Sequence, residues 1–118
     1  MGRKAINPIG QCFDSTAHQV LDWVLKKRVA GKVCHGIGVA TMPGQEGNVI
    51  KHAWIEENGF AYDTTWGVRV PADEYRAGLG LSYFVEYSIA DFMLNWLMND
   101  FPGPWDSKIE AAGQPYKT

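Results

Sequence analysis

The sequence predicts an α+β domain in which an N-terminal helix and a C-terminal helix pack on an antiparallel sheet. Three observations indicate this class. Apolar residues near the start of the chain recur with helical spacing, the middle of the chain alternates apolar and polar residues as strands do, and helical spacing returns near the end. Because short turns separate most of the strands, we expect them to pair antiparallel.

The first helix is expected over residues 12–30. Its apolar stripe occupies positions i, i+4, i+7, i+8 and i+11, which are Phe13, Ala17, Val20, Leu21 and Val24. Basic residues at 26–28 suit the negative end of the helix dipole, and Gly31 is expected to cap the helix.

Alternation predicts strands over residues 33–39, 49–57 and 60–66. The second and third flank Asn58-Gly59, the dipeptide most favoured in a two-residue hairpin loop because both residues can take positive φ.

The rest of the chain is expected to form a short helical turn at 73–76, a fourth strand at 81–87 and a last helix. Ser88 can cap that helix, and the Pro-Gly-Pro run at 102–104 is expected to stop it. The residues after Trp105 are weakly patterned and carry no predicted element.

Length and composition favour a single domain over residues 1–118. The chain has 46% hydrophobic residues, with five Trp, five Tyr and five Phe, which suffices for one core. A formal net charge of -2 with acids and bases mixed gives no basic surface for nucleic acid. The apolar runs are too short for a membrane span, and the first ten residues lack the apolar segment of a signal peptide, so a cytoplasmic protein is expected.

The hairpin places two polar residues together. A loop at residues 58–59 pairs Glu57 with Phe60, Ile55 with Tyr62, Trp54 with Asp63 and His52 with Thr65. Because side chains alternate along a strand, His52, Trp54 and Asp63 then share one face of the sheet. His52 and Asp63 are diagonal neighbours, roughly 7 Å apart, which an imidazole and a carboxylate can bridge. A carboxylate that orients a histidine is the arrangement a catalytic nucleophile needs.

Cys12 lies after a glycine-containing loop at the expected start of the first helix. The unpaired N–H groups and positive dipole end of a helix start favour a thiolate there and can stabilise an oxyanion. Gln11 can either donate to that oxyanion or only cap the helix. A thiol at this position would complete an acyl-transfer site if the helix start packs over the face that carries His52 and Asp63.

The order of these motifs resembles the transglutaminase-like branch of papain-type cysteine enzymes. The residues that carry the resemblance are G-Q-C-F at 10–13, H-A-W-I-E at 52–56 and Y-D-T-T-W at 62–66. It implies that Cys12 is the nucleophile, His52 the general base and acid, and Asp63 the residue that orients it. The family often has proline where this chain has Thr64. This chain is much shorter than the large transglutaminases, so the resemblance implies neither their calcium sites nor their accessory domains, and small bacterial and phage-type members are the nearer comparison.

Two other interpretations stay open. A zinc site could use some of Cys12, Cys34, His35 and His52, but these spacings match no closed Cys/His framework, and adjacent Cys34 and His35 face opposite sides of a strand. Taken alone, Cys34 is a small buried hydrophobe and His35 a residue that fills the sheet. The second interpretation is a binding or inhibitor module that keeps the fold without catalysis.

The function expected from the sequence is a cysteine-dependent amide hydrolase or acyltransferase with a protein or peptide substrate. Trp54 shares the catalytic face and is expected to wall the substrate cleft. The mechanism calls for no cofactor and no metal. Neither the acceptor, water or an amine, nor the oligomeric state follows from the sequence.

Overall fold

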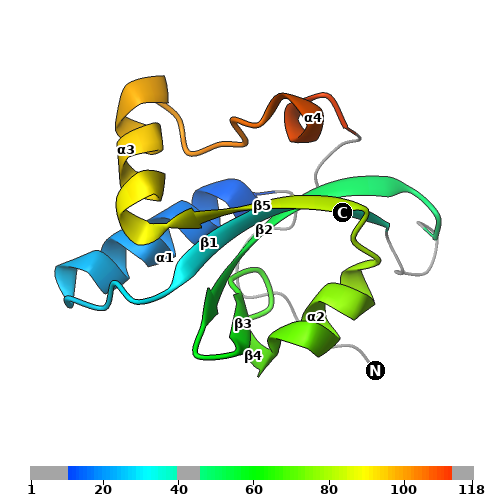
Figure 1. Cartoon of the computed structure of the whole chain (residues 1–118), viewed down its shortest axis with the longest axis horizontal. Helices are drawn as coiled ribbons and strands as arrows, with labels where there is room; N and C mark the ends of the chain where they lie inside the picture. Colours follow the sequence, from blue (N-terminus) through cyan, green and yellow to red (C-terminus); the bar gives the residue numbers. More distant parts are fainter. Residues whose placement is uncertain (1–10, 40–45, 113–118) are drawn as a thin grey trace.

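The computed structural model describes residues 11–39 and 46–112. Along the chain it forms α1 (Cys12–Leu25), β1 (Lys32–Val39), β2 (Val49–Glu57), β3 (Phe60–Asp63), β4 (Val68–Pro71), α2 (Ala72–Leu79), β5 (Tyr83–Ser88), α3 (Ile89–Asn99) and α4 (Ser107–Glu110) (Figure 1). The strands form one antiparallel sheet in the order β4-β3-β2-β1-β5. The predicted α+β class is therefore confirmed.

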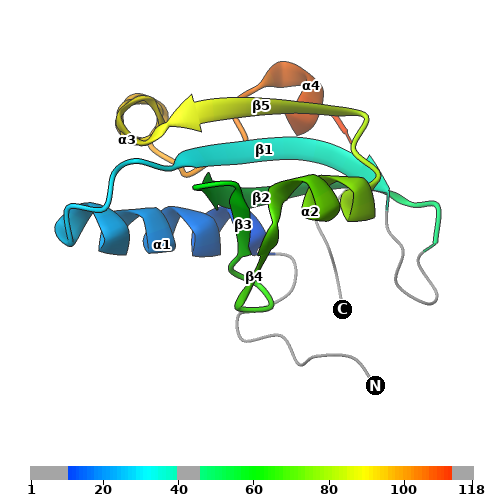
Figure 2. The same ribbon diagram turned by 60° about the horizontal axis from the view of Figure 1, so that its bottom comes forward.

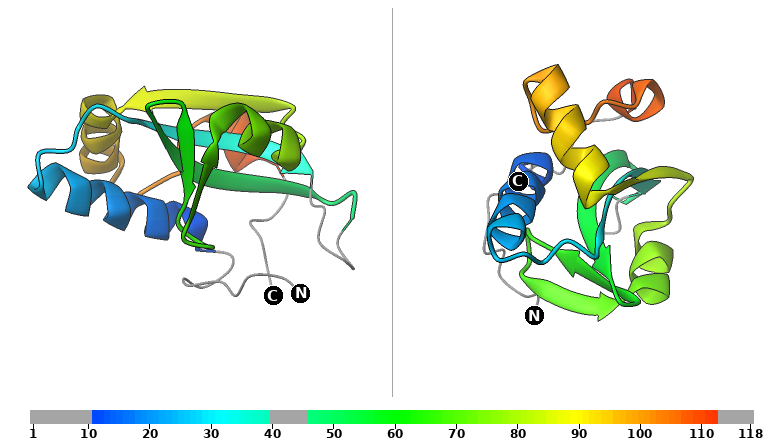
Figure 3. Two further views of the ribbon diagram at one scale, coloured as in Figure 1. Left: turned by 90° about the horizontal axis from the view of Figure 1, so that it is seen from below. Right: turned by 60° about the vertical axis from the view of Figure 1, so that its left-hand side comes forward.

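Helices cover both faces of the sheet (Figure 3). On one face, α1 and α3 enclose the larger core, which consists of Ala17, Val20, Trp23, Val33, Ile55, Ile89 and Phe92. On the other face, α2 covers a cluster formed by Cys34, Trp54, Ala61 and Leu79. The strand residues of the two clusters alternate along β1 and β2, as the period of a strand requires.

The hairpin between β2 and β3 has the predicted two-residue loop. Asn58 and Gly59 have φ of 53° and 80°, and the strands pair Glu57 with Phe60 and Ile55 with Tyr62. Both residues of the loop take the left-handed conformation that this tight turn demands. The register that puts His52 and Asp63 on one face is thus established by the loop.

The third strand is shorter than predicted. It ends at Asp63 and not at residue 66, and β4, which the sequence reading missed, follows after a turn at residues 64–67. The cause is Asp63 itself, because its carboxylate accepts the N–H groups of Thr65 and Trp66 while its carbonyl accepts the N–H of Gly67. A short side-chain acceptor that bonds its own downstream backbone ends a strand and begins a turn.

The first helix also ends earlier than predicted, at Leu25 instead of near residue 30. Lys27 takes φ of 60°, its N–H bonds the carbonyl of Val24, and the N–H of Arg28 bonds the carbonyl of Trp23. These two bonds form a Schellman motif with a lysine in the position that glycine usually occupies. The guanidinium of Arg28 lies 3.5 Å from the centre of the Trp23 ring and pairs with Glu57, which holds this helix end on β2.

The remaining boundaries shift more modestly. The helical turn expected at 73–76 is the longer helix α2, and β5 begins at Tyr83. Ser88 caps α3 as predicted, accepting the N–H of Asp91, and Figure 2 shows β5 running directly into α3. Asp100 in the left-handed conformation, not the proline run, ends α3. Helix α4, whose cap is Asp106, was not predicted.

Within residues 11–39 and 46–112, no helix combines the length and the apolar character that crossing a bilayer requires.

Replacing Gly59 by alanine is expected to lower the free energy of unfolding by about 1 kcal/mol, because a side chain at positive φ is strained even though nothing lies within 4 Å of the added Cβ. Gly78 is the matched control. It lies in α2 with equally open space and no positive φ, so Gly78→Ala should be neutral or stabilising by about 0.5 kcal/mol. Urea unfolding of the two variants measures both values, and equal destabilisation would contradict the turn geometry.

Candidate functional site

The three residues of the predicted site come from three different elements. Cys12 is the first residue of α1, His52 lies within β2, and Asp63 is the last residue of β3. All three are buried, with 1%, 1% and 5% of their surface exposed. A thiol, an imidazole and a carboxylate are thus enclosed together at one end of α1.

Helix α1 does not lie over the sheet face that carries His52, which corrects the expectation from the sequence. Its apolar side packs on Val33 and Ile55, on the opposite face. The start of α1 instead lies at the edge of β2 that β3 leaves uncovered, where the hydroxyl of Thr16 contacts the carbonyl of Ala53 at 3.4 Å. The thiol of Cys12 therefore approaches His52 around the edge of the sheet and not from above it.

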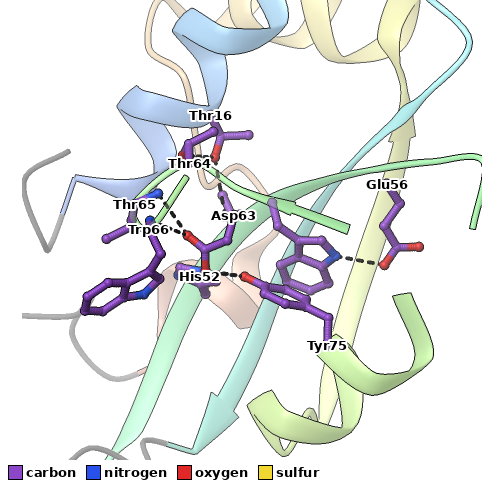
Figure 4. Close-up of polar contacts among 10 residues, drawn as sticks. Thr16, His52, Glu56, Asp63, Thr64, Thr65, Trp66 and Tyr75 are labelled. Atoms are coloured by element: carbon purple, nitrogen blue, oxygen red, sulfur yellow. Dashed lines mark hydrogen bonds and ion pairs between the residues drawn. The ribbon is translucent and has the colours of Figure 1, made fainter. Parts of the chain in front are cut away.

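The imidazole of His52 and the carboxylate of Asp63 are in contact. His52 Nε2 lies 3.2 Å from Asp63 Oδ2 (Figure 4). Tyr75 from α2 joins them, since its hydroxyl donates to Asp63 Oδ2 at 2.7 Å and lies 2.9 Å from His52 Nε2. The carboxylate thus fixes the edge of the imidazole that carries Nε2, as predicted from the hairpin register.

The other oxygen of Asp63 is held by the backbone. Oδ1 accepts the N–H of Thr65 at 2.9 Å and that of Trp66 at 3.3 Å. Burial by itself would raise the pKa of Asp63, but the bonds from His52, Tyr75 and this backbone lower it below its ordinary value. Asp63 is therefore a carboxylate at neutral pH, with both oxygens bonded.

The protonated form of His52 is favoured by its neighbours. Burial by itself would lower the pKa of His52, but the nearby Cys12 side chain and the bond to Asp63 outweigh burial and raise it to about 10. Asp63 and Tyr75 occupy the Nε2 side, so Nδ1 is the nitrogen that can serve the thiol.

The start of α1 presents backbone donors near the thiol. Gln11 is the N-cap residue and makes no capping bond with its side chain, so it does not cap α1 in the way the sequence allowed. The first bond within the helix runs from the N–H of Ser15 to the carbonyl of Gln11. The N–H groups before Ser15, including that of Cys12, have no acceptor within the helix and point out of its end. Such groups can bind an oxyanion.

Trp54 packs against His52 inside the domain. Its ring is fully buried and stacks beside His52, with ring centres 6.3 Å apart and planes 20° apart. Its indole N–H donates to Glu56. Trp54 therefore lies on the predicted face, but it packs behind the imidazole and presents no exposed surface as a cleft wall.

Tyr75 is the residue of this site that the sequence reading missed. The signal was present in the spacing of Ala72, Tyr75 and Leu79, which marks the side of α2 that faces the sheet. Because a helical turn was expected only at residues 73–76, the sequence did not predict that the side chain of Tyr75 points to the sheet.

Cys34 and His35, two residues of the zinc interpretation, lie on opposite faces of the sheet. Cys34 is buried against α2, and burial raises the pKa of its thiol above the ordinary value. His35 points to the other face among four aromatic rings, and burial lowers its pKa to about 3. In the described part of the chain, no group of three or more His, Cys, Asp or Glu side chains is arranged to hold a metal ion.

Comparisons of the chain with protein-family models, with curated proteins and with solved structures find no match. The site therefore has to be interpreted from its own geometry.

The charge of His52 should make the stability of the domain depend on pH. The pKa of His52 in the folded chain, about 10, lies above its ordinary value of 6.5. The folded state then binds more protons between these values, so this stabilisation is complete below pH 6.5 and is lost as the pH rises through about 10. Urea unfolding should show that Asp63→Asn costs most stability near pH 6 and progressively less toward about pH 10.

The control for this measurement is Asp73→Asn, which makes the same chemical change at an exposed carboxylate in the first turn of α2. Its effect should not follow the titration of His52. A cost of Asp63→Asn that is constant over the same pH range would show that Asp63 does not stabilise an imidazolium.

Proposed function

We propose that this protein is a cysteine-dependent amide hydrolase or acyltransferase in which Cys12 forms a thioester with its substrate. The observation that carries this proposal is the convergence of a helix-start thiol on a histidine whose far nitrogen is held by a buried carboxylate. These are the parts that nucleophilic acyl transfer requires: a nucleophile, an adjacent base and a group that orients the base.

In the first step, the Sγ thiolate of Cys12 attacks the carbonyl carbon of an amide and forms a tetrahedral oxyanion. Backbone N–H groups at the start of α1, and the side chain of Gln11 if it turns toward the carbonyl, would donate to this oxyanion. The imidazolium of His52 gives its proton to the leaving nitrogen, the C–N bond breaks, and an amine departs. A thioester on Cys12 remains.

In the second step, neutral His52 takes a proton from water or from an amine as that acceptor attacks the thioester. The C–S bond breaks, Cys12 leaves as the thiolate, and His52 is again an imidazolium. Water as the acceptor makes the protein a peptidase, amidase or deamidase, whereas a lysine amine makes it a crosslinking enzyme. Asp63 stays ionised throughout and stabilises the imidazolium at each stage.

The motifs around these residues support the same proposal. Their order and spacing resemble the transglutaminase-like branch of papain-type enzymes, and the α+β architecture with an N-terminal helix is compatible with that core. A protein or peptide is the substrate that this resemblance implies. The chemistry as proposed uses side chains and backbone alone, without a cofactor or a metal.

One observation favours the alternative of a binding module. Cys12 is 1% exposed and belongs to a cluster with Phe13, Ala53 and Ile109, the last contributed by α4. An enzyme with this structure must open the cluster to admit an acyl group, whereas a binding module need not. Reactivity of the thiol separates the two.

Cys12 is expected to react with iodoacetamide at least tenfold faster than Cys34 at neutral pH in the folded protein. The reason is that a thiolate is the reacting species, and burial disfavours the thiolate of Cys34. Peptide mapping by mass spectrometry after timed quenching measures both rates in one sample. Cys34 serves as the internal control, because it is the other cysteine of the chain.

Two variants extend the test to the imidazole. His52→Ala should slow alkylation of Cys12 by at least about tenfold, because the thiolate loses its cation. Cys12→Ala should abolish turnover of any amide or ester that the wild type cleaves, while leaving the fold intact. Equal alkylation of the two cysteines would leave the binding module as the better account, whereas turnover by Cys12→Ala would contradict catalysis through Cys12.

A further inference from the structure

A tyrosine from α2 completes the hydrogen bonding of the His52–Asp63 pair. Its hydroxyl lies 2.7 Å from Asp63 Oδ2 and 2.9 Å from His52 Nε2, so it lies between the two groups. The direct contact between His52 Nε2 and Asp63 Oδ2 is longer, at 3.2 Å. The shortest bond to the carboxylate therefore comes from the phenol and not from the imidazole.

The direction of each bond follows from the chemistry of the groups. The Tyr75 hydroxyl has one proton, which it donates to the ionised carboxylate. Its oxygen lone pairs then face His52, and the bond at 2.9 Å requires a proton on Nε2. The N–H of His52 is thus shared between Tyr75 and Asp63, and the other nitrogen, Nδ1, is left to exchange protons with the thiol.

The distances indicate how the charge of Asp63 is distributed. A bond between a charged N–H donor and a carboxylate is usually 2.7 to about 2.9 Å long. The contact from His52 exceeds that range, while the bond from Tyr75, at 2.7 Å, has the length usual for an O–H donor to a carboxylate. The hydrogen bond from the phenol partly neutralises the negative charge of the Asp63 carboxylate. The carboxylate then attracts the imidazolium less strongly.

We propose that Tyr75 is a positioning residue of the acyl-transfer site, which fixes the Nε2–H tautomer of His52 and weakens the pull of Asp63 on the imidazolium. This inference rests on the proposed function. The weaker attraction would help the reaction, because the imidazolium must donate its proton to the leaving amine. A carboxylate that attracted the Nε2–H at full strength would stabilise the imidazolium further and make the proton on Nδ1 harder to lose.

The surroundings of Tyr75 suit this role. The ring packs on buried Trp54 with centres 5.6 Å apart, and the next residue, Arg76, pairs with Glu56 on β2. Both contacts fix α2 against the face of the sheet that carries His52. The titratable groups that contact His52 from the described elements are Cys12 from α1, Asp63 from β3 and Tyr75 from α2.

The test is the proton resonance of His52 Nε2–H in the full chain at neutral pH, assigned with 15N-labelled histidine. In Tyr75→Phe the ring stays and the hydroxyl is lost, so the bond to Asp63 should shorten and the resonance should move to lower field. The pH at which His52 loses its proton should rise by about one unit, which is a tenfold change in proton affinity. A residue that only fills space would leave both unchanged.

Tyr83→Phe is the matched control. The hydroxyl of Tyr83 also donates to a carboxylate, Asp106, at 2.8 Å, but Tyr83 packs on the sheet face opposite the one that carries His52 and Asp63. This variant should leave the His52 resonance in place. If Tyr75→Phe does not fold, 3-fluorotyrosine incorporated at the five tyrosines of the otherwise unchanged chain makes each phenol a stronger donor. The resonance should then move to higher field.

An unmoved resonance in folded Tyr75→Phe, or a shift opposite to the one described, overturns the role of Tyr75. These readouts do not depend on catalysis. A shifted resonance together with an unreactive Cys12 would support the hydrogen-bonding role of Tyr75 and contradict acyl transfer. An unmoved resonance together with a reactive Cys12 would support acyl transfer and contradict the role of Tyr75.

Discussion

The two-residue loop at Asn58-Gly59 determines which side chains of β2 and β3 share a face of the sheet. With this loop, Ile55 pairs with Tyr62, so the adjacent residues Trp54 and Asp63 both point to the other face, and His52 lies one pleat farther along on that side. A slip of one residue would turn the carboxylate to the face that α1 covers and leave the imidazole buried without its partner. The burial of His52, and with it the whole site, therefore depends on the register that this loop imposes.

The early end of β3 has a second consequence. Because Asp63 bonds the backbone of the following turn, the strand stops and leaves the edge of β2 near Ala53 uncovered. The start of α1 fills this position, and Thr16 contacts both Ala53 and Thr64 there. One carboxylate thus orients His52 and also ends the strand that would otherwise separate His52 from Cys12.

Much of this arrangement follows from local rules, and the rest does not. Strand β2, the hairpin and the contact of His52 with Asp63 could be predicted, because side-chain alternation and a two-residue loop leave little freedom. The early end of α1 could not, since lysine rarely takes the left-handed conformation found at Lys27. The contribution of Tyr75 was also missed, because it depends on how α2 packs in three dimensions. The approach of Cys12 around the sheet edge is likewise a tertiary feature.

The claim that Cys12 carries an acyl group is tested most directly by trapping that group. The folded protein is mixed with an activated ester such as p-nitrophenyl acetate, quenched in acid within the first turnover, and mapped by mass spectrometry. The account predicts one acetyl group per chain, on Cys12, released by hydroxylamine and formed much more slowly in His52→Ala. No acetylation of Cys12, or acetylation that is as fast without His52, would contradict it.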